Sequence, residues 1–310
     1  MIESHAPEPP CPITGAAPQR WVQWLSKGML VDLWRYSFRV DVSDQVSDIE
    51  RFGIWESPTG LLYFDPPRGG DGDFYRRFYG RIGAHDRLSG PRILRSEFVR
   101  AASHVVPGTR VLDVGCGEGG FRRYLSSCEY LGLDPNFGGQ RPDIRAETIE
   151  AHAAQNSSHY DAVCSFQVVE HVPDPLGFVR AMVAALRPGG LLLIGVPCWP
   201  SPGTDIPNFV INAPPHHLTL WTESALRALC AQSGLACRAI EPIPVSGHAT
   251  LIYWMGRFAP KFSSDRLFRN AWSWHLGLLW CYLAAQCVDP FLAPPASAHA
   301  IELLMVAEKL

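Results

Sequence analysis

The chain lacks an excess of charge of either sign. Its 27 lysine and arginine residues are nearly balanced by 30 aspartate and glutamate residues, and the formal net charge is −3. Proteins that bind nucleic acid neutralise the phosphate backbone with clustered basic side chains, and this balance provides no such surface. We therefore expect no nucleic-acid partner.

Two further features are missing, a disulfide framework and a secretory signal. The nine cysteines are odd in number and irregularly spaced, so they predict no set of disulfides. The first residues, MIESHAPEPPCPITG, lack a basic segment followed by an apolar stretch. Both absences favour a reducing compartment, and we expect the protein to be cytoplasmic.

A long uninterrupted apolar run is also absent. The most apolar segment, residues 271–288, is interrupted by His275 and Gln286, and Pro290 follows it. It therefore falls short of the ~20 apolar residues of a membrane-spanning helix. We expect a lid over an active site or a dimer face, in which case the protein partner is a second copy of the chain. Its tryptophans leave another interpretation open, a helix lying on a membrane surface.

The composition does provide a packed core, because 47% of the 310 residues are hydrophobic. From Pro91 onward, apolar strands alternate with helices, a pattern typical of parallel α/β folds. The expected strands are 109–115, 130–134, 144–148, 160–166, 191–197, 237–243 and 301–308. The expected helices are 93–105, 119–127, 149–156, 174–186 and 222–235, with a mostly helical stretch at 250–293. We divide the chain into an N-terminal cap region (1–90), a core (91–249) and a helical insertion with the final strand (250–310).

The segment VLDVGCGEGG at 111–120 places glycines where a buried strand turns into a helix. Glycine permits positive φ angles and close approach of a ligand, and a helix N-terminus attracts a carboxylate or a phosphate. Gly115, Gly117 and Gly120 also fit the dinucleotide pattern G-x-G-x-x-G. However, Asp113 would repel a pyrophosphate and attract the cationic groups of S-adenosylmethionine, while Asp134 can accept both ribose hydroxyls. A glycine-rich turn with no ligand is the remaining alternative.

Five segments in succession resemble the motifs of class I S-adenosylmethionine-dependent methyltransferases. They are VLDVGCGEGG, YLGLDPN, YDAVCSFQVVEHVPDP, LRPGGLLLIGVP and PPHHLTLWTESALRALCAQSGL, and they occur in order over about 105–240. The chain looks most like the branch that includes ubiquinone-biosynthesis O-methyltransferases and sugar methyltransferases. The resemblance implies a Rossmann-like α/β fold, in which seven mostly parallel strands form a sheet whose last strand is antiparallel. An N-terminal cap and a C-terminal helical insertion would be added to it.

The resemblance also implies where the cofactor binds. Asp113, Gly115 and Gly117 would line its methionine end, and Asp134 would hold the ribose. Thr148 and Ile149 would edge the adenine, and Phe166 and Gln167 would border the methyl group. The cofactor-binding residues are thus expected to be Asp113, Gly115, Cys116, Gly117, Asp134, Pro135, Thr148, Ile149, Phe166 and Gln167. The expected product is S-adenosylhomocysteine.

Many relatives of this branch carry an N-terminal zinc ribbon, which here looks degenerate. The segments Cys11-Pro-Ile-Thr-Gly15 and Glu56-Ser-Pro-Thr-Gly-Leu61 resemble its two cysteine motifs, but only Cys11 supplies a thiolate. Because such a site needs four ligands, we expect no zinc and no other metal. The segment would keep a hairpin held by aromatic packing, unless the similarity arises by chance.

Three histidines follow strands at the edge of the sheet where ligands bind. His171 follows the strand at 160–166, and His216 and His217 precede the helix at 222–235. A hydroxyl or carbon nucleophile benefits from a base, and neutral imidazole can accept a proton near pH 7. We expect at least one of these residues to be catalytic. The alternative is that they only hydrogen-bond the loops or orient the substrate.

The sequence therefore predicts a methyltransferase that acts on a small molecule or glycan, by O- or C-methylation. Two other classes remain open. One is a non-catalytic partner protein that binds S-adenosylmethionine, and the other is an NAD-dependent oxidoreductase, which Asp113 and the later motifs disfavour.

Overall fold

A seven-stranded sheet forms the centre of the computed structural model, which describes residues 8–82, 95–247, 249–261 and 266–310. Its strands are β4 (Arg110–Val114), β5 (Glu129–Leu133), β6 (Ile144–Arg145), β7 (Tyr160–Phe166), β8 (Leu186–Pro197), β10 (Leu235–Ile243) and β11 (Glu302–Lys309). The order across the sheet is β10-β11-β8-β7-β4-β5-β6. The strands from β8 to β6 pair in parallel, and β11 pairs antiparallel with both β8 and β10. The expected Rossmann-like fold with an antiparallel last strand is confirmed.

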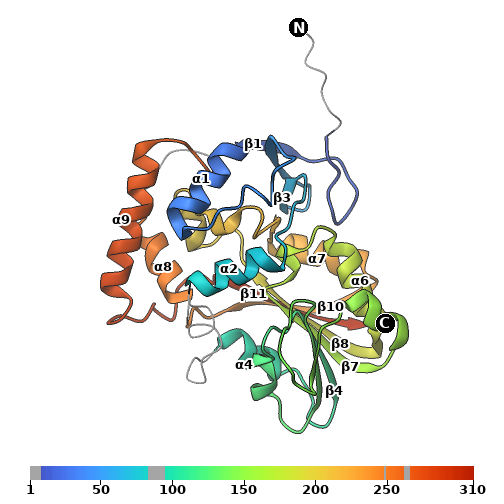
Figure 1. Cartoon of the computed structure of the whole chain (residues 1–310). Helices are drawn as coiled ribbons and strands as arrows, with labels where there is room; N and C mark the ends of the chain where they lie inside the picture. The colour runs from blue at the N-terminus through green and yellow to red at the C-terminus, as the bar shows by residue number, and fades with distance from the viewer. Residues whose placement is uncertain (1–7, 83–94, 248, 262–265) are drawn as a thin grey trace.

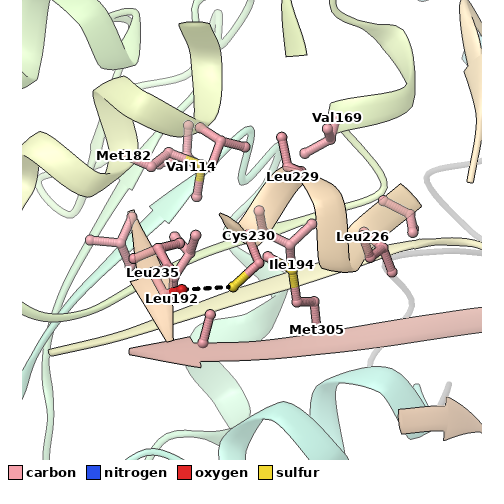
Figure 2. Packing of buried hydrophobic residues seen from close by; sticks show 14 of the residues in the cluster. Val114, Val169, Met182, Leu192, Ile194, Leu226, Leu229, Cys230, Leu235 and Met305 are labelled. Atoms are coloured by element: carbon pink, nitrogen blue, oxygen red, sulfur yellow. Dashed lines mark hydrogen bonds between the residues drawn. The ribbon is translucent and has the colours of Figure 1, made fainter. Parts of the chain in front are cut away.

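Helices cover both faces of this sheet because its strands are apolar on both sides. On one face lie α5 (Ile149–Gln155), α6 (Pro175–Ala185) and α7 (Glu223–Gln232). Figure 2 shows their packing, in which Leu226, Leu229 and Cys230 of α7 meet Ile194 and Met305 of the sheet. On the other face lies α4 (Ser96–Ala102), whose Phe98 packs against Phe121 and Phe166.

Helix capping follows the sequence closely. Asp174 caps α6 by accepting a hydrogen bond from the Gly177 amide at 2.9 Å, and Pro175 is the first helical residue. Thr222 caps α7 in the same way through the Ala225 amide.

The expected helix at 119–127 is wrong in extent. Only a 3₁₀ helix, η1 (Gly120–Tyr124), forms there, after Gly119 at φ +69°.

A second, four-stranded sheet lies above the first, in the order β1-β2-β3-β9. It consists of β1 (Arg20–Ser26), β2 (Arg51–Glu56), β3 (Leu62–Asp65) and β9 (Thr219–Leu220). The hairpin of β2 and β3 is the segment expected to be ribbon-like. The last strand comes from the core rather than from the N-terminal region, so a core loop is joined to this sheet by backbone hydrogen bonds.

Two helices of the N-terminal region pack beside the second sheet. They are α1 (Lys27–Phe38) and α2 (Gly72–Ile82). Trp34 of α1 is fully buried between Phe74 and Phe78 of α2, and its indole N–H donates to the Pro214 carbonyl at 2.9 Å. Through this bond α1 also contacts the loop that precedes β9.

The C-terminal insertion contains α8 (Ala249–Phe258) and α9 (Trp272–Val288), which pack on one another at one side of the molecule (Figure 1). One side of α9 is exposed and apolar, with Trp272 83% and Trp280 60% exposed. Among the described residues, no helix has the length and apolar character needed to cross a bilayer.

Candidate active site

A cavity of about 2210 Å³ opens at the carboxyl ends of β4, β5, β7 and β8. Typical ligand pockets measure about 300–1,000 Å³, so this one has room for a cofactor and a second molecule. All but one of the residues predicted to form the site line its wall. They are Gly115, Cys116, Gly117, Asp134, Pro135, Thr148, Ile149, Phe166, Gln167, His171, His216 and His217.

The glycine-rich turn after β4 forms one end of the cavity. Gly115 and Gly117 have φ angles of +72° and +52°, which favour glycine. The amides of Gly115 and Cys116 both donate to the Leu133 carbonyl, at 2.7 and 3.0 Å, and so hold the turn against β5. A Cβ atom on Gly115 would lie 2.4 Å from Val168. Both the positive φ angle and the short distance to Val168 therefore favour glycine at position 115.

Asp134 follows β5 and is held rigidly on the wall of the cavity. Its Oδ2 accepts from the Gly117 amide at 3.0 Å, and its Oδ1 accepts from the Asn136 amide at 2.9 Å. Each carboxylate oxygen can accept further hydrogen bonds. The geometry suits the paired hydroxyls of a ribose, and it fixes the carboxylate before any ligand arrives.

Asp113 is the exception, because it does not line the cavity. It is 3% exposed beneath the glycine-rich turn, where the Tyr130 hydroxyl donates to its Oδ2 at 2.7 Å. Burial raises the pKa of Asp113 to about 7, although the hydrogen bonds from Tyr130 and Cys164 and the charge of Arg95 oppose this shift. A direct contact of Asp113 with a cofactor stays a prediction.

The raised pKa of Asp113 makes stability depend on pH. Its folded pKa lies above the unfolded value of 3.8, so its contribution is full below pH 3.8 and is lost as the pH rises through about 7. We expect Asp113→Asn to reduce the loss of unfolding free energy between pH 5 and pH 8, measured by urea denaturation. Tyr130→Phe, which removes a bond to the charged form, should increase that loss. An equal pH dependence in all three proteins would contradict this assignment.

Three further predicted residues on the cavity wall are engaged in local contacts. The Thr148 hydroxyl caps α5 by accepting from the Ala151 amide at 3.3 Å, and its carbonyl accepts from the His152 amide at 3.1 Å. Ile149 is buried beside it. Gln167 has a φ of +59°, in the left-handed region, and its Nε2 donates to Glu97 Oε1 at 2.9 Å.

The sequence analysis missed a buried polar group next to Gln167. Glu97, on α4, is fully buried and pairs with Arg95 at 2.8 Å. Arg95, Gln167 and Glu302 all line the cavity. Burial raises the pKa values of both Glu97 and Glu302. The one available signal was Glu97 on the apolar side of an expected helix, which alone does not predict a site.

His171, His216 and His217 come together and form what we call the histidine cluster. Their ring centroids lie 4.4 to 4.9 Å apart, and the rings of His216 and His217 are stacked. The amide of Leu218 donates to the Glu170 carbonyl at 2.8 Å, which joins the loop after β7 to the loop before β9. The sequence placed all three residues at this edge of the sheet, but it gave no sign that they contact one another.

Burial makes the histidine cluster poorly basic. It lowers the pKa of His171 to about 4 and the pKa values of His216 and His217 well below their usual range. Burial also raises the pKa of Glu170, which is 1% exposed, well above its ordinary value. At neutral pH the imidazoles are therefore uncharged and can serve as hydrogen-bonding or ligating groups.

Helix α2 lines the cavity with an aromatic side that includes Tyr75, Phe78 and Tyr79. Tyr75, Phe78 and Tyr79 surround the ring of His216. Two of its arginines pair with acids that do not line the cavity, Arg76 with Asp73 at 2.6 Å and Arg77 with Asp44 at 3.1 Å, and Arg76 and Arg81 themselves line it. The aromatic side of α2 thus faces the histidine cluster.

Comparison with known proteins identifies similar sequences and structures. Ubiquinone biosynthesis O-methyltransferase of Xanthomonas campestris is 33% identical over 132 residues, covering 38% of this chain and 55% of that protein. The same enzyme of Escherichia coli O157:H7 is 34% identical over 111 residues, covering 31% and 46%. The matched segment thus spans about half the length of these relatives. A SAM-dependent methyltransferase structure from Archaeoglobus fulgidus has a TM-score of 0.47 at 16% identity, covering 74% of this chain and all of that one.

The family model of the methyltransferase domain matches residues 77–240, which is more than half of the chain. This range contains the glycine-rich turn, Asp134 and the histidine cluster. The chain therefore belongs to the methyltransferase domain family, which confirms the resemblance to class I S-adenosylmethionine-dependent methyltransferases.

Proposed function

We propose that the protein transfers a methyl group to an oxygen or carbon atom of a small molecule that binds beside the histidine cluster. The observation that carries this proposal is one continuous cavity, which joins the glycine-rich turn and Asp134 to the histidine cluster. The similarity to O-methyltransferases over the core supports an oxygen acceptor.

The walls of the cavity favour an acceptor with an extended apolar part. Beyond the histidine cluster, the cavity is lined by Met29 and Leu33 of α1, Met255 of α8, and Leu276 and Leu279 of α9. Burial of apolar surface contributes roughly 25 cal/mol per Å² to binding. A glycan, whose surface is mainly polar, would gain less here and is the second candidate.

Cofactor binding would use the wall residues predicted from the sequence. The backbone of Gly115, Cys116 and Gly117 would approach the methionine end, and the Asp134 carboxylate would accept from the ribose. Pro135, Thr148 and Ile149 would border the adenine, and Phe166 and Gln167 would border the transferred methyl group. Bound S-adenosylmethionine supplies an electrophilic methyl on a cationic sulfur. The protein contributes alignment and exclusion of water, for which the buried walls around Phe166 are suited.

We also propose that three segments of the chain have different roles. Residues 1–90 would form a cap over the acceptor, residues 91–249 the cofactor-binding core, and residues 250–310 a lid with the final strand. The contacts of α9 with the cavity, through residues such as Tyr282, support the lid. Its outer apolar side leaves a dimer face or a membrane-surface contact as further proposals.

The first test concerns Asp134. We expect Asp134→Ala to weaken S-adenosylmethionine binding by about 1–3 kcal/mol, because charge-assisted hydrogen bonds are lost. Titration calorimetry would measure the change. Glu129→Ala, at the exposed opposite end of β5, is the matched control and should bind normally. Unchanged affinity in Asp134→Ala would remove Asp134 from the site.

A second test separates catalysis from binding alone. Incubation with radiolabelled methyl donor and a panel of hydroxylated aromatic acceptors, with and without apolar chains, should yield labelled product and S-adenosylhomocysteine. Binding of the cofactor with no turnover on any acceptor would favour a non-catalytic partner protein.

A further inference from the structure

Ring nitrogens of the three residues of the histidine cluster lie close together. One ring nitrogen from each of His171, His216 and His217 lies within 4.8 Å of the other two. Within the part of the chain that the structure describes, this is the one group of three or more His, Cys, Asp or Glu side chains in such an arrangement. The cluster also lines the cavity, so an ion or a ligand can reach it.

Backbone carbonyls fix the protonation of two of the rings. His171 Nδ1 lies 2.6 Å from the His216 carbonyl oxygen, and His216 Nδ1 lies 3.1 Å from the Ile211 carbonyl oxygen. A carbonyl accepts only, so each Nδ1 must carry the proton and donate. In a neutral ring the Nε2 atom then carries a lone pair. This is the usual arrangement of metal-binding histidines, whose second nitrogen donates to a carbonyl or carboxylate.

Four further polar atoms of this region have no hydrogen-bond partner among the described residues. His216 Nε2, His217 Nδ1 and both carboxylate oxygens of Glu170 are buried without a hydrogen bond. Glu170 Oε1 lies 3.7 Å from His171 Nε2, which is beyond hydrogen-bonding distance. A buried polar atom without a hydrogen-bond partner destabilises the folded protein, because it loses its contacts with water and gains none in return. Several such atoms around one point are typical of a site that binds an ion or a ligand.

We propose that His171, His216 and His217, with Glu170 beside them, bind a divalent transition-metal ion of the zinc type. Neutral imidazole suits such ions, and three protein ligands with one open position are typical of catalytic zinc sites. The sequence analysis expected no metal because it considered only the degenerate ribbon. This site consists of different residues and lies in the core.

The geometry requires only modest adjustment. Zn–N distances of about 2.0–2.1 Å in a tetrahedral site place ligand nitrogens roughly 3.4 Å apart. The three nitrogens lie within 4.8 Å, so small ring movements close the difference. Glu170 would complete the shell or accept a hydrogen bond from a water on the ion. An ion would also compensate the buried carboxylate, which no cation contacts among the described residues.

An acceptor hydroxyl explains fewer of these observations. It could donate to one lone pair, but it could accept no bond from the Nε2 atoms of His171 and His216, which carry lone pairs when Nδ1 is protonated. Both oxygens of Glu170 would remain without a donor. A cation satisfies all of these atoms at once, and its open position would then hold an acceptor oxygen from the cavity.

The test is metal binding by the whole chain, measured without any methyl acceptor. Protein stripped with a chelator would be titrated with Zn²⁺ by calorimetry and with Co²⁺ by visible absorption, which reports the ligand geometry. We expect one ion per chain and a ligand-field band in the Co²⁺ spectrum. Absence of stoichiometric binding to the wild-type protein overturns the proposal.

Variants locate the ion. His171→Ala and His217→Ala should weaken binding by at least about 100-fold, since the loss of a supporting contact alone costs 10–100-fold. Glu170→Gln, which keeps the size of the side chain, should weaken it less. His275→Ala, on α9 and also at the cavity, and Cys11→Ser in the ribbon-like segment should bind normally. Binding that survives in the first two variants and is lost in Cys11→Ser would assign the metal to the ribbon and overturn the proposal.

The readout is independent of the proposed methyl transfer. Calorimetry with S-adenosylmethionine on the same samples reports the cofactor site separately. Circular dichroism melting of each variant shows whether it is folded. Even if a histidine variant does not fold, the wild-type titration shows whether the chain binds one metal ion. Metal binding with no turnover would leave the metal site standing and the proposed function in question.

Discussion

Replacement of a residue of the histidine cluster by alanine is expected to lower turnover by about 100-fold or more, in at least one of His171→Ala, His216→Ala and His217→Ala. The cluster lines the part of the cavity in which we propose that the acceptor binds, and a group that activates or orients a nucleophile there contributes ~10²–10⁴-fold. Affinity for S-adenosylmethionine should change little, because Asp134 and the glycine-rich turn are separate. Steady-state kinetics and calorimetry on each variant would measure the two effects.

Controls must separate chemistry from packing. His216 lies among aromatic rings, so its removal leaves a cavity, and rates should be normalised to the folded fraction. Glutamine variants retain a hydrogen-bonding group, and partial activity in them would indicate orientation of the acceptor. His159→Ala, on the exposed surface, should have normal turnover. Near-normal rates in all three alanine variants would mean that alignment and desolvation alone account for the transfer.

Gly115→Ala is expected to destabilise the protein by about 2–5 kcal/mol. A left-handed residue with a Cβ atom costs roughly 1–2 kcal/mol, and overpacking adds about 1–3 kcal/mol. The new Cβ atom would lie 2.4 Å from Val168, which can relax only if the turn moves. Such movement displaces the backbone that would contact the cofactor, so binding should weaken at least about tenfold. Urea denaturation and calorimetry would measure both quantities.

Gly117→Ala is the matched control, since its φ is also positive but nothing lies within 4 Å of the added Cβ atom. It should cost only the conformational part, about 1–2 kcal/mol. In the double variant Gly115→Ala/Val168→Ala the clash is removed. Its loss in free energy of unfolding should therefore be about 1–3 kcal/mol smaller than the sum of the losses in the two single variants. Equal stability of the Gly115→Ala and Gly117→Ala proteins would show that the contact with Val168 is unimportant.

The central sheet could be predicted from the sequence because its signals are local. Apolar runs such as 160–166 and 191–197 are strands wherever they are buried on both faces, and glycines at 115 and 117 mark the turn that follows. The caps Asp174 and Thr222 were equally readable. By contrast, the second sheet depends on β9, which pairs with β3 from more than 150 residues away. No local pattern reports such a pairing.

The positions of the candidate site residues were likewise predictable where they depend on local signals and not where they depend on tertiary packing. Residues that follow strands, such as Asp134 and His171, line the cavity as expected because parallel strands end at one edge of the sheet, and their roles stay a prediction. Asp113 was expected on the wall, but the pleat directs it beneath the turn, where Tyr130 holds it. Glu97 and Glu302 meet through tertiary packing between α4 and β11, which the sequence does not encode locally.

The junction between β9 and the N-terminal sheet has a consequence for how acceptor specificity can change. The loop that carries His216 and His217 is anchored at Pro214 by Trp34 and continues directly into β9. If the N-terminal region were exchanged between related enzymes, the residues that contact the acceptor would change. The orientation of His216 and His217 would change as well, because the N-terminal region holds their loop in place. A chimera joined at residue 95 should bind the cofactor as the parent of its core does, but it should methylate the acceptor of neither parent. Activity toward an acceptor should return when the segment 208–221 is exchanged together with the cap.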